Sequence, residues 1–374
     1  MKKQNRLLSL ILSLFLLLFT LVPQSALTVK AEGNSEMAVH FIDVGQGNAI
    51  LVQSGGQNLL YDGGDQSHAD LIISYLQEQN VENIDYMIAS HYDEDHIGGL
   101  VPCIDNFSVS NIFGPDYVHT SNLFNNFMNT ATANAIIVQY PSVGETFDFG
   151  TGSFTVLAPN GISQNSNDNS LVIKLENGSN SFIFTGDAEE TSEAEMLTNG
   201  IDIAADVYKV AHHGSRSAST QEFLNAVHPK YAVISCGEGN SYGHPHAEVL
   251  NRLRSMGVEV FRTDEQGSII ASSDGENINW NCSATDSWQS GEQTESDREN
   301  SEDENPGDEN SGNAISDAVT SEQTTYVLNT NTKKFHRETC GSVSQIKEEN
   351  FQKVQMSREE LEQSGYSPCK NCNP

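Results

Sequence analysis

"ASHYDEDHIGGL", residues 89–100, is the stretch that decides the fold. It follows the apolar run "IDYMI", which we expect to be a short buried strand, and two glycines follow its charged centre. The side chains crowded into its centre are His91, Asp93, Glu94, Asp95 and His96. Carboxylates this close repel one another unless a cation lies among them, so the spacing predicts a metal site at a strand end. The alternative is that these are ordinary polar loop residues and helix N-caps, a common role of Asp.

Other acidic and imidazole side chains follow other predicted strands. They are Asp62 after "NLLY", Asp187 after "FIFTG", His212 and His213 after "YKVA", and His244 and His246 after "ISCGEGNSYG". Strand ends in layered α/β folds converge on one edge of the sheet, so we expect these groups to meet the opening motif there. His119 has no partner visible in the sequence, and it is assigned no role.

The spacing of the opening motif suits two metal ions. Residues 91 and 93 can face one ion, residues 95 and 96 can face a second, and Asp187 can lie between them. Two ions about 3.5–4 Å apart activate water and stabilise a departing oxygen together. Asp93, in place of a second histidine, shifts the preference from Zn²⁺ toward Mn²⁺ or Mg²⁺ without deciding the matter. We expect two divalent ions in this domain, Mn²⁺ or Zn²⁺.

The N-terminal residues 1–31 have the pattern of a secretory signal peptide. Three basic residues precede an almost wholly apolar run at 7–22, and "VKA" at 29–31 resembles a cleavage site. The alternative is a retained membrane anchor. No second apolar run of spanning length follows, so we expect an exported, extracellular protein without stable membrane insertion after cleavage.

Charge and composition divide the rest of the chain into three parts. Residues 32–282 carry 33 Asp and Glu side chains against 7 Lys and Arg, a balance of −26 within a net charge of −32. So acidic a domain is unsuited to coating duplex DNA electrostatically. Residues 283–324 contain 12 acidic side chains, one arginine and few large apolar residues, which predicts a disordered linker. Residues 325–374 are near neutral and form a separate module.

Seven motifs carry a resemblance to a known family over about residues 37–275. In order they are "FIDVGQGNAILV", "LLYDGG", "SHYDEDHIGG", "NDNSLVIKL", "FIFTGD", "VAHHGS" and "GHPHAEVL". Together they resemble the metallo-β-lactamase superfamily and, more narrowly, the extracellular hydrolase domain of the competence protein family ComEC. The resemblance implies an α/β fold, the αββα sandwich, with a dinuclear metal site. The membrane channel of that family is absent, so we expect a hydrolase and no DNA transporter.

The resemblance also implies roles for individual residues. The implied metal ligands are His91, Asp93, Asp95, His96, Asp187 and His212, with His213 a rival of His212 that the sequence cannot separate. Asp62 matches an acid that is not itself a ligand and that orients the metal-binding loop. Asn169 and Ser170 lie where the superfamily often places a further histidine, and Asn48 stands where ComEC-type domains usually have Asp. His244 and His246 match a segment that faces the substrate, where either binds phosphate or donates a proton; with Asp95 they are the expected catalytic residues.

The C-terminal module has the ligand spacing of a structural zinc site. His336 and Cys340, then Cys369 and Cys372, supply one imidazole and three thiolates. One zinc ion would stabilise a unit too small to be held by its core alone. The module resembles the zinc-binding module of the Ada DNA-repair protein, with His336 where that module has cysteine. The alternative is a pair of disulfides or loose thiols.

Three functions follow from these observations. The leading hypothesis is an exported, metal-dependent phosphodiesterase that cuts nucleic acid. The second is a hydrolase of a small ester, a lactone or a cell-wall phosphodiester, which the acidic main domain favours. The third is a DNA-binding or surface-binding protein in which the metals are structural. The sequence does not indicate the oligomeric state.

Overall fold

The computed structural model describes residues 36–292 and, toward the C-terminus, residues 324–337, 340, 343, 346–347, 350–356, 361 and 366–369. The chain divides into two compact units, Met1–Glu302 and Asp303–Pro374. The predicted signal peptide and most of the predicted linker lie outside the described residues. Within the described part of the chain, no helix is long and apolar enough to cross a bilayer.

The first unit contains an eight-stranded sheet with the order β15-β14-β1-β2-β3-β4-β5-β6. Its strands are β1 (Met37–Phe41), β2 (Ala49–Ser54), β3 (Gln57–Gly63), β4 (Asn83–Ile88), β5 (Ser108–Phe113), β6 (Val138–Gln139), β14 (Ile269–Ser273) and β15 (Ile278–Trp280). Strands β1 to β3 are antiparallel, whereas β3 to β6 run parallel. The parallel strands are joined through α2 (Ala69–Glu78), α3 (Glu94–Ile97), α4 (Leu100–Asn106) and α5 (Asn122–Ala133).

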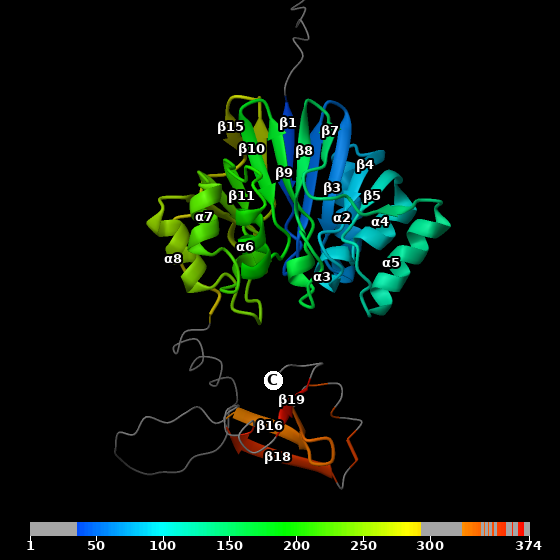
Figure 1. The fold of residues 1–374 in the computed structure, drawn as a ribbon, viewed down its shortest axis with the longest axis vertical. Coiled ribbons are helices and arrows are strands. Elements are labelled where there is room, and N and C mark those ends of the chain that lie inside the picture. Colours follow the sequence, from blue (N-terminus) through cyan, green and yellow to red (C-terminus); the bar gives the residue numbers. More distant parts are fainter. Residues whose placement is uncertain are drawn as a thin grey trace, which may run out of the picture. The chain divides into compact units, whose positions relative to one another are not determined.

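A seven-stranded sheet faces the first, with the order β13-β12-β11-β10-β9-β8-β7. Its strands are β7 (Thr146–Phe149), β8 (Gly152–Ala158), β9 (Val172–Asn177), β10 (Asn180–Phe184), β11 (Val207–Lys209), β12 (Tyr231–Ile234) and β13 (Glu259–Arg262). Helices α6 (Glu190–Thr198), α7 (Gln221–Val227) and α8 (Ala247–Ser255) join its parallel strands, and the short α9 (Thr263–Gln266) follows β13. Figure 1 shows the helices on the two outer sides of the paired sheets.

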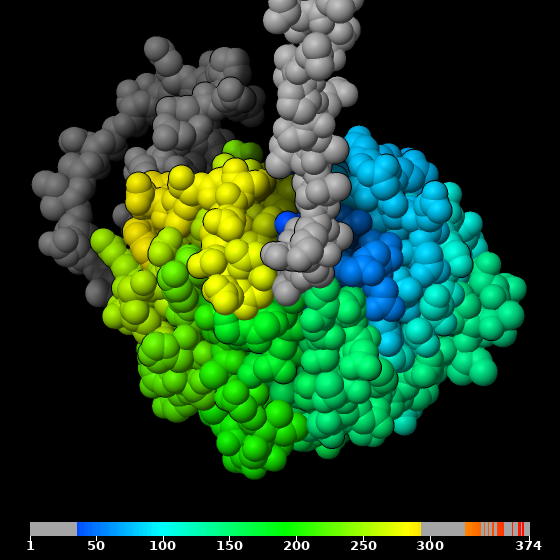
Figure 2. Space-filling view, turned by 90° about the horizontal axis from the view of Figure 1, so that it is seen from above, coloured from blue at the N-terminus to red at the C-terminus, as the bar shows by residue number. Residues whose placement is uncertain are grey.

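The central strands of both sheets, such as β2, β9 and β11, are buried on both faces, whereas the edge strands β7 and β15 are partly exposed. On β2, Ile50 and Val52 point into the core between the sheets, whereas Leu51 packs toward the helices. On β3, Tyr61 points inward and Leu60 outward. Successive side chains of a strand face opposite sides, so a strand covered on both sides is apolar throughout. The predicted αββα sandwich is confirmed. Figure 2 shows the first half of the unit's sequence, in blue to teal, on one side and the second half on the other.

The segment 283–292, which the sequence assigns to the linker, lies against the first unit. Trp288 packs against the apolar cluster that contains residues of α7 and α8. The backbone of Gly291 donates a hydrogen bond to Pro245 O at 3.0 Å, and Arg262 Nη1 donates to Gln289 O at 2.6 Å. A single large indole anchors a segment that composition alone describes as polar.

The second unit contains a four-stranded sheet with the order β18-β16-β17-β19. The strands are β16 (Thr324–Asn329), β17 (Lys334–Arg337), β18 (Phe351–Met356) and β19 (Ser367–Pro368). Its described buried core is the small cluster Tyr326, Leu328, Phe335 and Leu361.

Candidate active site

The candidate site lies where parallel strands of both sheets end. His91 follows β4, and Asp95 and His96 belong to α3, the short helix after it. Asp187 follows β10, and His213 lies in η3 (Ala211–Gly214), the turn after β11. The carboxyl ends of parallel strands meet at one edge, which brings together residues far apart in the chain.

Four side chains, three buried and one half-buried, form a group that we call the Asp187 group. Its members are Asp95, His96, Asp187 and His213, whose potential ligand atoms all lie within 4.8 Å of one another. His96 Nε2 is 3.2 Å from Asp187 Oδ1, and His213 Nε2 is 3.3 Å from Asp95 Oδ2 and 3.4 Å from Asp187 Oδ2. Among the described residues, Nε2 of both histidines and Oδ1 of Asp187 have no hydrogen-bond partner. Buried polar atoms without partners are rare, and a divalent cation among them would satisfy all of these at once.

The charges of the Asp187 group shift one another strongly. Burial opposes ionisation of Asp187, but the imidazoles of His213 and His96 outweigh burial and hold the pKa of this carboxyl well below its usual value. Burial likewise opposes protonation of His96, yet Asp187 and Asp62 raise the pKa of this imidazole well above its usual value. The carboxylates thus stabilise a positive charge placed between them, as the ligands of a bound cation do.

His91 and Asp93 lie beside this group. His91 is fully buried, and its ring centroid is 4.2 Å from that of His96. His91 Nε2 has no hydrogen-bond partner among the described residues and lies 3.6 Å from Asp93 Oδ2. The structure therefore brings the five predicted ligands of residues 91–96 and 187 to one place.

The structure places His213, and not the predicted ligand His212, in the Asp187 group. Both residues have left-handed backbone angles, with φ of 48° and 54°. His213 Nδ1 donates to Ser235 O at 2.8 Å, which turns Nε2 inward. His212 Nδ1 instead lies 2.9 Å from Glu189 Oε1, and its Nε2 is 3.8 Å from Asp187 Oδ2. This bond to Glu189 keeps His212 at the partly exposed rim.

His119 is one of the site residues that the sequence reasoning missed. Its Nε2 lies 3.5 Å from Asp93 Oδ1, which is the carboxylate oxygen that does not face His91. Ser121 N donates to His119 Nδ1 at 3.3 Å, so Nε2 of the neutral ring carries the proton that faces Asp93. No local sequence signal connects His119 to Asp93, because only the fold brings the α5 entry beside the metal-binding loop.

Asn169 and Ser170, at the position of the further superfamily histidine, are engaged elsewhere. Asn169 Oδ1 accepts from Ser163 N at 2.6 Å, and its amide donates to Ser163 O at 3.1 Å. Ser170 Oγ accepts from Asp187 N at 3.1 Å. Asn169 thus closes a loop, whereas Ser170 supports the backbone of Asp187.

Asp62 lies directly behind the ligands and is fully buried. Its Oδ1 accepts from Ser90 N at 2.7 Å. Its Oδ2 accepts from Ser90 Oγ at 2.8 Å, from Asn48 Nδ2 at 2.9 Å and from His96 Nδ1 at 2.8 Å. Asn48 therefore donates to this carboxylate, which a carboxylate at position 48 could not do without taking up a proton.

The two glycines of the opening motif allow the close approach of backbones. A Cβ on Gly99 would lie 2.0 Å from the carbonyl oxygen of Gly63, at the end of β3. A Cβ on Gly98 would lie 2.4 Å from Gln66 N. The loop that carries the ligands can press against the end of β3 and the turn that follows it only because both positions lack side chains.

Two further imidazoles form the rim that faces the Asp187 group. The His244 ring is nearly parallel to that of His213, at 21° and 6.1 Å between centroids, and lies 4.9 Å from the His246 ring. Burial, together with the neighbouring His213 and His212, lowers the pKa of His244 to about 3. Burial and Arg216 lower the pKa of His246 as well. Both rings are therefore neutral at neutral pH.

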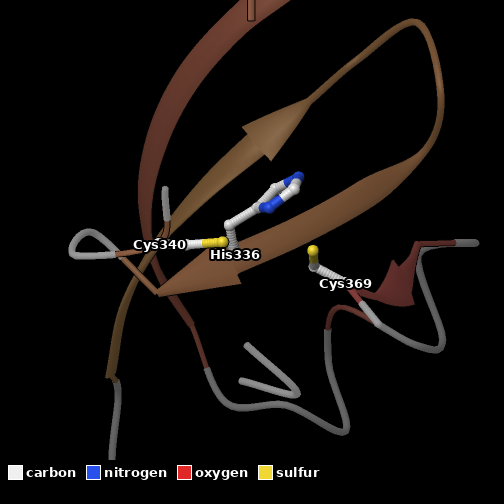
Figure 3. A group of neighbouring side chains, drawn as sticks. All are labelled: His336, Cys340 and Cys369. Atoms are coloured by element: carbon white, nitrogen blue, oxygen red, sulfur yellow. The ribbon is translucent and has the colours of Figure 1, made fainter. Parts of the chain in front are cut away.

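The second unit contains its own group of potential ligands. His336, Cys340 and Cys369 are buried, and their ligand atoms lie within 4.8 Å of one another. Figure 3 shows both sulfur atoms directed toward the histidine. His336 Nδ1 has no hydrogen-bond partner among the described residues. One imidazole and two sulfurs suit a soft divalent ion. The fourth predicted ligand, Cys372, lies outside the described residues.

Comparisons with known proteins agree with this fold. A family model described as "Metallo-beta-lactamase superfamily" matches residues 42–238. ComE operon protein 3 of Bacillus subtilis is 31% identical over 255 residues, which cover 63% of this chain and 33% of that protein. Competence protein ComA of Neisseria gonorrhoeae is 32% identical over 246 residues, 64% of this chain and 33% of that protein. Recombination protein 2 of Haemophilus influenzae is 32% identical over 237 residues, 62% of this chain and 28% of that protein.

The chain thus spans about a third of the length of these curated relatives. Among solved structures, the metallo-beta-lactamase fold protein YhfI from Bacillus subtilis has a TM-score of 0.46 and 16% sequence identity. That match covers 64% of this chain and 100% of YhfI.

Proposed function

Because the chain belongs to the metallo-beta-lactamase superfamily, a fold of metal-dependent hydrolases, we propose that it is a metal-dependent phosphodiesterase that cuts nucleic acid. The observation that carries this proposal is the convergence of His96 Nε2, His213 Nε2 and Asp187 Oδ1, which are buried without hydrogen-bond partners in the described chain. Support for a nucleic acid substrate comes from the similarity to a ComE operon protein, a competence protein and a recombination protein.

The residues present fit two divalent cations. The Asp187 group would hold one ion, and His91 with Asp93 would hold the other. When bound, such ions make water a stronger nucleophile and stabilise the departing oxygen. The mixture of carboxylates and imidazoles accepts Mn²⁺ as well as Zn²⁺.

The residues behind the ligands prepare each imidazole to bind. Ser90 Oγ donates its only proton to Asp62, so this oxygen accepts the Nδ1 proton of His91, 3.0 Å away. Asp62 accepts the Nδ1 proton of His96, and Ser235 O accepts that of His213. With an ion bound, each of the three rings would keep a single proton, on Nδ1, and would present the Nε2 lone pair to the ion.

The rim histidines hold the substrate's phosphate by hydrogen bonds. Gln46 Nε2 lies 3.3 Å from His244 Nδ1, and Arg216 N donates to His246 Nδ1 at 3.1 Å. Nδ1 therefore accepts in both rings, and Nε2 carries the proton. Because a pKa of about 3 keeps His244 neutral at neutral pH, this ring donates a hydrogen bond to an anionic oxygen and is a poor source of a full proton.

The test is a cleavage assay on the full chain with labelled single-stranded DNA, duplex DNA and RNA, after chelation and reloading with Mn²⁺, Mg²⁺ or Zn²⁺ separately. Asp187→Ala should lose both bound metal and cutting. Glu94→Ala is the matched control, because Glu94 is an exposed carboxylate within the same loop, and it should cut normally. Metal-loaded protein that cuts none of the three polymers would overturn the proposal.

A second candidate function is hydrolysis of a small ester, a lactone or a cell-wall phosphodiester. The observation in its favour is the scarcity of basic side chains, since residues 32–282 contain only 7 Lys and Arg. Lys174, Lys209 and Arg262 are buried, which reduces the number that can meet a polyanion. Turnover of such substrates by a metal-loaded sample that leaves nucleic acids intact would establish it.

We also propose that the protein is exported and that its second unit holds one structural zinc ion. The basic and apolar pattern of residues 1–31 supports export. The group His336, Cys340 and Cys369, with Cys372 as the predicted fourth ligand, supports the zinc site. N-terminal sequencing of protein recovered from the culture medium and metal analysis of Cys369→Ser test the two statements separately.

A further inference from the structure

A column of three nearly parallel rings leads from the Asp187 group to solvent. The His213 ring belongs to that group, and His244 lies over it at 21° and 6.1 Å between centroids. Tyr242 continues the column, again at 21° to His244 and with centroids 5.6 Å apart. Tyr242 is 65% exposed, so the column ends in an aromatic ring that is open to solvent.

The loop that carries Tyr242 is held in place by Asn240. The side-chain oxygen of Asn240 accepts from Tyr242 N at 3.1 Å and from His244 N at 3.0 Å. Its amide donates to Gly237 O at 2.9 Å and to His244 O at 2.6 Å. One side chain thus fixes both ends of the turn, and with it the backbone that carries Tyr242.

A cavity of about 380 Å³ lies beside the exposed ring. Tyr242, Ser241, His246 and Glu292 are among the residues that line it. Glu292 pairs with Arg216 and places a carboxylate in this space. A carboxylate repels phosphate but accepts hydrogen bonds from the amino groups of nucleobases. The cavity therefore offers a hydrogen-bond acceptor to a base that lies beside Tyr242.

We propose that Tyr242 is a stacking platform for one unpaired nucleobase of the substrate, next to the phosphate that is cut. This inference rests on the proposed function. Base stacking on an aromatic side chain changes affinity by about 5- to 150-fold and tolerates any sequence, because every base has a π face. Bases in a duplex are already stacked and paired, so the platform selects single strands. It also supplies affinity without positive charge, which a domain with so few basic side chains requires.

The first experiment measures binding without relying on cleavage. Fluorescence anisotropy of the full chain, with Mn²⁺ present, compares a short single-stranded oligonucleotide with the same strand made abasic throughout. If the wild type cuts the strand during the measurement, the Tyr242 variants are compared in a protein that also carries Asp187→Ala. Tyr242→Ala should weaken binding of the base-containing strand by about 5- to 150-fold and leave binding of the abasic strand unchanged. Tyr242→Phe, which keeps the ring, should bind like the wild type.

The second experiment measures steady-state cleavage. Tyr242→Ala should raise KM for single-stranded oligonucleotide with little change in kcat, and it should narrow the preference for single strands over duplex. An equal loss of activity on single-stranded and duplex substrates would assign Tyr242 a structural role and overturn the inference. Unchanged binding of the base-containing strand would overturn it as well. If the wild type cuts no nucleic acid, the proposed function fails. The anisotropy comparison still decides whether Tyr242 binds a base. Metal content and thermal melting verify that each variant is folded.

Discussion

Asp62→Asn is the substitution that tests the interpretation of the site most directly. The carboxylate is fully buried and accepts four hydrogen bonds, three of them on Oδ2. If the Asn oxygen keeps its bond to Ser90 N, the new amide faces Asn48 Nδ2 and His96 Nδ1, which are both donors. Hydrogen bonds to a charged group contribute about 1.5–3 kcal/mol each, so losing both lowers the free energy of unfolding by about 3–6 kcal/mol, and by about half of that if His96 restores its bond by changing its tautomer.

The effect on metal binding follows from the tautomer of His96. With a donor at position 62, His96 gains a hydrogen bond by moving its proton from Nδ1 to Nε2, and the lone pair that faces Asp187 is lost. Loss of such a supporting partner lowers metal affinity by about 10–100-fold. Competition with a chelator measures that affinity, and urea denaturation of the metal-free protein measures stability.

The matched control is Asp70→Asn, an exposed carboxylate in the first turn of α2. It makes the same chemical change away from the site, and it should leave metal affinity unchanged and stability nearly so. A folded Asp62→Asn protein with the metal affinity of the wild type would refute the argument that Asp62 sets the tautomer of His96.

Three other substitutions test separate parts of the structure. His213→Gln should bind less metal per chain than His212→Gln, because only His213 belongs to the Asp187 group. Elemental analysis measures the metal content of both variants, and the reverse order would contradict the assignment of His213. His119→Ala should lower the affinity of His91 and Asp93 for a metal ion by about 10–100-fold, since His119 Nε2 lies beside the Asp93 oxygen that does not face His91. His119→Gln retains a hydrogen-bond donor and should recover part of this affinity, and isothermal titration with Mn²⁺ measures both variants. Gly99→Ala would place a Cβ 2.0 Å from a backbone oxygen of β3 and should lower the free energy of unfolding by about 1–3 kcal/mol or more in urea, while an unchanged midpoint would show that the loop can move away.

The sequence by itself determined the layers of the fold and the location of the site. The layers follow from seven motifs whose order resembles the metallo-β-lactamase superfamily, and each of these motifs is local. The spacing of His91, Asp93, Asp95 and His96 is also local, because a single turn after β4 carries all four side chains. Asp187 could be added because it follows another strand whose carboxyl end lies at the same edge.

Only the tertiary structure decided which neighbouring side chains face inward and which partners they meet. His212 and His213 are adjacent and have nearly the same backbone angles, yet Ser235 O turns one ring into the site and Glu189 holds the other at the rim. His119 reaches Asp93 only through the packing at the start of α5. A sequence pattern records burial and strand ends, whereas the direction of a loop side chain depends on hydrogen bonds to residues that are distant in the chain.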